Sequence, residues 1–174
     1  MKMNGVKKGF LAFGFTLFFG LAAFAQGDLE NVQSMFIHHF IKYIEWPATS
    51  SNGDFVIGVT GNDALFKEIE SKLNGKPRPG GKIVVRKINS ASQVNGLQIV
   101  VLGKDGTKDF DNYKAQTAGK PILLITEERG LGKRGSSINF IVVNGKLKFE
   151  LNKSVIDAQK LRVSSSLTQV AVMI

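Results

Sequence analysis

The sequence predicts an α/β fold built on a six-stranded, mainly parallel sheet with a C-terminal antiparallel hairpin, flanked by about five helices. Two observations predict this class. First, uninterrupted apolar segments alternate with helical patterns, which is typical of parallel strands covered on both faces. Second, polar and apolar residues alternate on both sides of Asn144-Gly145 near the C-terminus, and this dipeptide is the strongest short signal for a hairpin.

Residues 1–25 have the pattern of a cleavable signal peptide. Lysines without any acidic residue precede an apolar run from Gly9 to Leu21, and Ala23-Phe24-Ala25 supplies small residues at a cleavage site. The run is shorter than the roughly 20 residues that a membrane-spanning helix needs, and no cysteine follows it for lipid attachment. We therefore expect export, cleavage after Ala25, no lipid anchor, and a single mature domain over residues 26–174.

Charge and composition exclude several classes of function. The formal net charge is +9, but the predicted leader contributes Lys2, Lys7 and Lys8, and the other basic residues are spread along the chain. This distribution favours a solvated surface, and export argues against a nucleic-acid partner. The absence of cysteine excludes disulfides, thiol nucleophiles and cysteine-based metal sites.

The first helix is predicted from Asp28, as the N-cap, to Tyr43 or Ile44, with Pro47 ending it. Its polar residues form one narrow stripe of Asn31, Ser34, His38, Lys42 and Glu45. The apolar arc that remains is wider than the roughly 100° that a surface helix needs. This helix is therefore expected either to be largely buried or to contact another molecule.

The remaining elements follow from apolar runs and turn residues. Apolar strands are expected at residues 55–61, 82–88, 97–103 and 121–126, before the two strands of the hairpin. Helices are expected at residues 63–73, 107–117 and 153–160, followed by an amphipathic tail over residues 164–173.

The sequence predicts no catalytic or metal-binding residues. The only histidines, His38 and His39, are adjacent on a helix and point roughly 100° apart, so they cannot bind one ion together. We expect His38 to be solvated and His39 to be packed. No G-x-S-x-G motif accompanies them, and three nearby aspartates lack the spacing of a calcium loop: Asp105, Asp109 and Asp111.

Glycines and charged residues lie at the ends of the predicted strands, where ligand sites of α/β proteins occur. Gly58, Gly61 and Gly103 form neither G-x-G-x-x-G nor a phosphate-binding loop, so no cofactor is expected. Glu127-Glu128 beside Arg129 has the composition of an acid/base pair, but a solvated loop is the preferred interpretation. The segment 130–135 has the composition of a flexible basic loop, which either receives an anion or only turns the chain.

Six segments together resemble the YfiR-like (DUF4154) family of periplasmic proteins, in order and spacing over essentially the whole mature chain. They are FIHHFIKYIEWP (residues 36–47), FVIGVTG, KIVVRKI, LQIVVLG, RGSSINFIVVNGKLKFELN and LRVSSSLTQVA. The resemblance implies a six-stranded sheet with five helices. It also implies a periplasmic, non-enzymatic regulator that binds the periplasmic domain of a membrane diguanylate cyclase or histidine kinase and represses it. Because the chain lacks cysteine, redox control is excluded, and any homodimer must form by packing alone.

Two groups of residues are candidates for binding. Tyr43, Trp46 and Pro47 at the end of the first helix are expected to contact a protein partner, although Trp46 filling the core is an equal alternative. Four polar residues near strand ends form either a small-ligand pocket or salt bridges: Arg134, Asn139, Glu150 and Arg162. A small-molecule-binding or transport-accessory protein that uses the α/β cleft is the alternative function.

Overall fold

Parallel strands form the centre of the fold over residues 26–48 and 53–174, which the computed structural model describes. The predicted signal peptide lies outside these residues. The main sheet consists of β2 (Phe55–Thr60), β3 (Pro77–Arg78), β4 (Gly81–Lys87), β5 (Ile99–Leu102), β6 (Leu123–Thr126), β7 (Ile138–Val143), β8 (Lys146–Leu151) and β10 (Val172–Met173).

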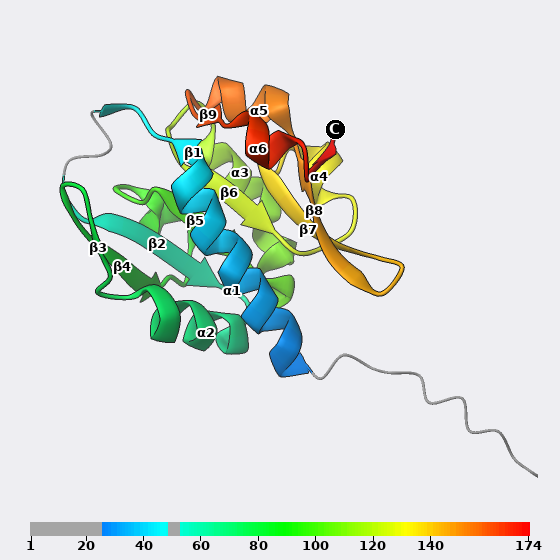
Figure 1. Ribbon diagram of the computed structural model, residues 1–174, viewed down its shortest axis with the longest axis horizontal. Coiled ribbons are helices and arrows are strands. Elements are labelled where there is room, and N and C mark those ends of the chain that lie inside the picture. The colour runs from blue at the N-terminus through cyan, green and yellow to red at the C-terminus, as the bar shows by residue number, and fades with distance from the viewer. Residues whose placement is uncertain (1–25, 49–52) are drawn as a thin grey trace, which may run out of the picture.

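The strand order is β10-β8-β7-β6-β5-β2-β4-β3 (Figure 1). Neighbours from β4 to β7 pair in parallel, whereas β8 runs antiparallel to β7, and β3 antiparallel to β4. The predicted parallel sheet and C-terminal hairpin are thus confirmed. Asn144 and Gly145 have φ values of 50° and 71°, the positive angles that a tight two-residue hairpin turn requires.

The sheet has eight strands in the described residues, so the predicted number of six was wrong. The additional strands, β3 and β10, have two residues each and lie at the two edges. A segment this short has no periodicity that a sequence pattern can reveal. A separate two-stranded sheet pairs β1 (Ile44–Glu45) with β9 (Arg162–Val163) and joins the end of the first helix to the C-terminal region.

Helices cover both faces of the sheet (Figure 1). In the described part of the chain they are α1 (Gln26–Tyr43), α2 (Asp63–Leu73), α3 (Phe110–Thr117), α4 (Leu131–Arg134), α5 (Lys153–Ala158), α6 (Ser165–Thr168) and the 3-10 helices η2 (Ala91–Val94) and η3 (Lys104–Asp109). The expected flexible loop at residues 130–135 is instead the short helix α4. Gly130 and Gly135 lie at its two ends in the left-handed region.

Two apolar cores lie on opposite faces of the sheet. One contains Phe40 of α1 with Phe55 and Phe149 of the sheet, and the other contains Phe110 and Tyr113 of α3. Successive residues of β5 and β6 contribute alternately to the two cores, because side chains of a strand point to opposite faces in turn. Both faces of the central strands are therefore buried, as the uninterrupted apolar runs predict.

The orientation of α1 differs from the expectation. Ile37, Phe40 and Ile44 face the core, whereas His39 is exposed, so the expected packing of His39 was wrong. His39 lies two positions from Ile37, about 200° around the helix, and therefore points away from the sheet. Ser34, which belongs to the predicted polar stripe, is only 1% exposed because this part of α1 packs against α2, where Lys72 Nζ donates to Ser34 Oγ at 3.2 Å.

Candidate functional site

A cleft lies at the carboxyl ends of the parallel strands. The chain leaves β2 for β4 on one side and later crosses to β5 on the other side, so the connections diverge between β2 and β5. In α/β sheets this topological switch point is the usual position of a ligand-binding crevice. The segments after β2, β5 and β6 all reach the cleft, as does the first part of α1.

The segments after β2 and β5 are in close backbone contact at the edge of the cleft. Asp105 N donates to Gly61 O at 3.0 Å, and Gly103 N donates to Thr60 O at 2.8 Å. A Cβ atom on Gly61 would lie 2.3 Å from Gly106 N. Glycine is thus required at position 61, because a side chain would push the two segments apart.

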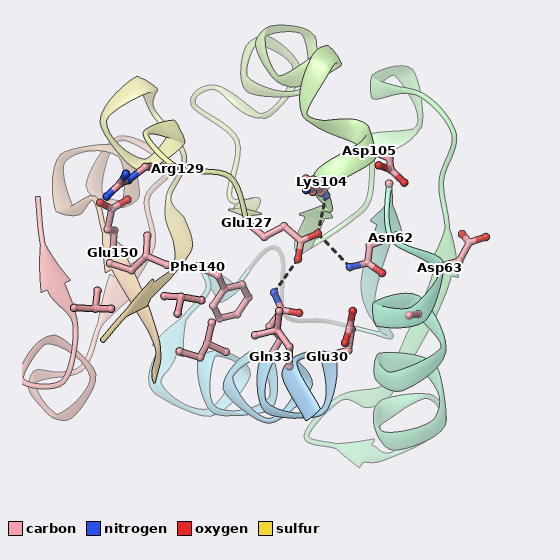
Figure 2. Close-up of a pocket in the computed structure, with 17 residues that line it drawn as sticks. Glu30, Gln33, Asn62, Asp63, Lys104, Asp105, Glu127, Arg129, Phe140 and Glu150 are labelled. Carbon is pink, nitrogen blue, oxygen red and sulfur yellow. Dashed lines mark hydrogen bonds between the residues drawn. The ribbon is translucent and has the colours of Figure 1, made fainter. Parts of the chain in front are cut away.

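The carboxylate of Glu127 joins four segments in the middle of the cleft (Figure 2). Its Oε1 accepts hydrogen bonds from Asn62 Nδ2 at 3.1 Å and Lys104 N at 2.6 Å, and its Oε2 accepts one from Gln33 Nε2 at 2.8 Å. Glu127 follows β6 directly and therefore connects the sheet to α1, to the start of α2 and to η3. Glu127 is half-buried, so the expected solvated loop holds only for its exposed neighbours Glu128 and Arg129.

Asn62 has two roles at the start of α2. Its Oδ1 accepts a hydrogen bond from Leu65 N at 3.0 Å and so caps the helix. Its Nδ2 donates to Glu127, as described above. One side chain therefore pairs with one free N–H group at the start of the helix and also holds the Glu127 carboxylate at the cleft.

A second polar group comes from β7 and β8. Asn139 is fully buried, accepts from Thr126 Oγ1 at 2.7 Å and donates through Nδ2 to Glu150 Oε2 at 2.8 Å. Glu150 reaches the cleft from the wall opposite Asn62 (Figure 2). Phe140, Val142 and Leu147 supply the apolar part of this wall.

The cleft has a volume of about 1110 Å³ and a mixed lining. Acidic side chains outnumber basic ones in it, with five against two, although the chain as a whole is basic. Asp63 at the rim is paired with Lys87 at 2.6 Å, and the hydrogen bond and charge of Lys87 lower the pKa of Asp63 below its usual value. The other carboxyl groups leave the cleft negative on a positive protein.

Tyr43, Trp46 and Pro47 are all half-buried at the end of α1. Trp46 packs edge-on against Phe55, with ring centroids 4.9 Å apart, and its Nε1 donates to Gln98 O at 3.3 Å. Tyr43 stacks on the exposed His39, with centroids 6.0 Å apart. Trp46 and Tyr43 both pack against the core on the α1 side of the sheet, and Tyr43 also contacts His39 on the exposed side of the helix.

The structure brings together only two of the four predicted pocket residues. Asn139 and Glu150 are hydrogen-bonded at the cleft, as described above. Arg134 is exposed, pairs with Asp111 at 3.0 Å and lies over the Phe110 ring at 5.2 Å. Arg162 is exposed in β9, opposite Glu45 of β1. Neither arginine lines the cleft.

The sequence interpretation missed Glu30 and Gln33, which line the cleft from α1. Both are buried, with 2% and 1% of their surface exposed. A signal was present: these positions extend the spacing of three and four residues that relates Ile37, Phe40 and Ile44 toward the start of the helix. Polar residues on the buried face of a helix usually meet polar partners, here Gln33 with Glu127.

Neither a metal site nor a membrane span is found in residues 26–48 and 53–174. No three histidine or acidic side chains there are arranged to hold an ion. None of the helices in the same segments combines the length and apolar character that crossing a bilayer requires. His38 and His39 lie on the exposed side of α1, outside the cleft lining.

Comparison with models of protein families shows the family to which the chain belongs. The YfiR/HmsC-like family model (DUF4154) matches residues 30–172, which include every strand of the main sheet except the last residue of β10. The chain belongs to the YfiR/HmsC-like family. The family is periplasmic and regulatory rather than catalytic, and the resemblance inferred from the six sequence segments is thus confirmed.

Two solved structures resemble this chain at low sequence identity. An ABC domain in complex with L-Trp from Streptococcus pneumonia has a TM-score of 0.51 at 8% identity, covering 83% of this chain. A conserved domain protein from Vibrio cholerae has a TM-score of 0.49 at 10% identity, with the same coverage. This YfiR/HmsC-like chain spans 59% of each of those chains. At such identities the similarity concerns the fold alone, and no curated protein matches the chain significantly.

Proposed function

We propose that this protein is a non-enzymatic periplasmic regulator that binds the periplasmic domain of a membrane sensor, a diguanylate cyclase or a histidine kinase, and represses it. Membership of the YfiR/HmsC-like family is the observation that carries the proposal. The signal-peptide pattern of residues 1–25 supports the periplasmic location. A periplasmic protein that controls a process in the cytoplasm does so through a partner that crosses the membrane.

The outer stripe of α1, defined as Val32, Met35, His39 and Tyr43, is the surface we assign to the sensor. Met35 is 53% exposed and Val32 37% exposed. The spacing of three and four residues places these side chains on one side of the helix. An apolar helix stripe that ends in an aromatic residue suits a groove on a protein partner. Trp46 and Pro47 follow it and are assigned to the border of the same interface.

Site-specific photocrosslinking in intact cells tests this assignment. A photoreactive amino acid at Met35 is expected to capture a membrane cyclase or kinase. The same group at Gln116, which is exposed on α3 at the opposite face of the sheet, is the matched control and is expected to capture neither. Capture of no membrane sensor from position 35, or equal capture from both positions, would contradict the proposal.

If the protein represses its sensor, a substitution that weakens their binding should raise the output of the sensor. Met35→Asp places a charge on the apolar stripe and is expected to relieve repression, so that the output of the sensor rises several-fold at an unchanged protein level. Gln116→Asp is expected to leave the output unchanged. A fall in output with Met35→Asp would indicate activation in place of repression.

Small-molecule binding or a transport-accessory role is the second function, and the acidic cleft favours it. The cleft lies at the switch point of the sheet, with buried polar groups of α1 on one side and apolar groups beside Glu150 on the β7–β8 side. Binding of a ligand by the purified protein, with no sensor captured in cells, would support this function over the first.

A further inference from the structure

Two buried side chains of α1 leave acceptor atoms without hydrogen-bond partners at the cleft. They are Glu30 Oε2 and Gln33 Oε1, in side chains that are 98% and 99% buried by the exposures given above, and no described residue donates to either atom. Buried polar atoms are almost always paired, and a buried acceptor without a donor costs about 1–3 kcal/mol. Figure 2 shows both side chains rising from α1 toward Asn62 and Glu127.

The orientation of the Gln33 amide follows from its neighbour. An ionised carboxylate only accepts hydrogen bonds, so the Gln33 nitrogen must face Glu127, to which it donates at 2.8 Å. The Gln33 oxygen is thereby left as an acceptor. Glu127 Oε2 accepts only this one bond in the described residues and retains capacity for a second.

The atoms with remaining hydrogen-bonding capacity on this side of the cleft are all acceptors, so a ligand must supply donors to them. Glu30, Gln33 and Glu127 each present one acceptor oxygen, and two of the three side chains are acidic. An anion would be repelled here. A primary ammonium group has three donors, one positive charge and no acceptor, which matches this set. A metal ion is disfavoured because no group of three acidic or histidine side chains in the described segments is arranged for one.

The opposite wall specifies the rest of the ligand. Phe140, Val142 and Leu147 line it beside Glu150, and Val142 is 62% exposed. Contact with an apolar group would remove this surface from water, which is favourable. The two walls together suit a molecule with a cationic end and an apolar body.

We propose that the cleft binds a small molecule that carries a primary ammonium group on an apolar body. The ammonium group donates to Glu30, Gln33 and Glu127, and the body packs on Phe140, Val142 and Leu147. This site is separate from the outer stripe of α1, and the inference does not rest on binding to a sensor.

Calorimetry on the purified protein without any partner tests the proposal. The probes are phenethylammonium, 2-phenylethanol as its neutral analogue, 3-phenylpropanoate as an anion of similar size, and methylammonium, which lacks the apolar body. Phenethylammonium is expected to bind at least about 10-fold more tightly than each of the other probes. Absence of phenethylammonium binding at millimolar concentration, or equal binding of the alcohol or the anion, would overturn the proposal without any variant.

Variants of the protein test whether the ammonium group of the probe lies at Glu30. Glu30→Gln keeps the size of the side chain, removes the charge, and is expected to weaken phenethylammonium binding about 10-fold or more. Glu128→Gln removes an exposed carboxylate outside the lining and is expected to change nothing. Equal affinities of these two variants would show that the ammonium does not lie at Glu30, and this result overturns the assignment. Circular dichroism spectra of both variants establish that the proteins compared are folded.

Discussion

Gly61 and Gly75 adopt similar backbone angles in different surroundings. Their φ values are +72° and +80°, in the left-handed region that residues with a Cβ rarely adopt. A Cβ on Gly75 would meet nothing within 4 Å, whereas one on Gly61 would meet the backbone of Gly103 and Gly106. Substitutions at the two positions therefore separate the energetic cost of the positive φ angle from the cost of disturbing the backbone contact at Gly61.

Alanine at these two positions is expected to have unequal effects. Gly75→Ala should lower the free energy of unfolding by about 1 kcal/mol, the cost of the backbone angle. Gly61→Ala should lower it by about 2–3 kcal/mol more, because the backbone segments after β2 and β5 must move apart. Urea unfolding followed by circular dichroism measures both values, and similar values would contradict the close contact.

Glu127 and Glu128 have different environments that the sequence around them does not predict. They are adjacent, identical in type and follow the same strand, yet Glu127 accepts three hydrogen bonds at the cleft and Glu128 is exposed. The donors to Glu127 lie 94, 65 and 23 positions away in the chain. No local pattern contains this information, and the preferred sequence interpretation of a solvated loop failed for this reason.

The start of α2 couples a secondary-structure element to the cleft. The cap formed by Asn62 is a local feature, and the helix start predicted at residue 63 is confirmed. The bond from Asn62 to Glu127 is not local, because it depends on the alignment of β2 with β5 and β6.

A double-mutant cycle tests that coupling. Asn62→Asp retains an oxygen for the cap but replaces the donor to Glu127 by a second negative group, and we expect a loss of about 1–3 kcal/mol in the free energy of unfolding. The loss should shrink in a Glu127→Gln background, because the repulsion is removed. Asn62→Ser, which keeps a capping oxygen but has no amide donor, measures the loss of the bond to Glu127 without an added charge. An unchanged cost of Asn62→Asp in the Glu127→Gln background would disprove the coupling.

The two cores share the same central strands, and this should make unfolding of the whole molecule cooperative. Trp46, the only tryptophan in the chain, packs on Phe55 in the α1-side core. Phe110 is 1% exposed in the other core. The fluorescence of Trp46 thus reports on one face of the sheet when a residue is changed on the other.

Phe110→Ala is expected to lower the free energy of unfolding by about 3–5 kcal/mol, as for other buried phenylalanines. The fluorescence transition of Trp46 and the circular dichroism transition should shift together, because β5 and β6 contribute to both cores. A fluorescence transition that stays in place while the circular dichroism transition moves would show that the two faces unfold independently.

The sequence by itself determined the α/β class, the parallel central strands, the C-terminal hairpin and the membership of the family. These depend on patterns within short segments: apolar runs, helical spacing, the Asn144-Gly145 turn and ordered sequence blocks. Such patterns are visible because the physical cause lies within a few residues of its effect.

Only the tertiary structure decided the direction in which α1 faces, the short edge strands and the composition of the cleft. Glu30 and Gln33 line the cleft because α1 packs near the end of β6, and Asn139 contacts Glu150 because β7 and β8 pair. The physical reason is that a cleft at the switch point of a sheet is assembled from segments that are distant in the chain. Its chemistry exists only after those segments have packed together.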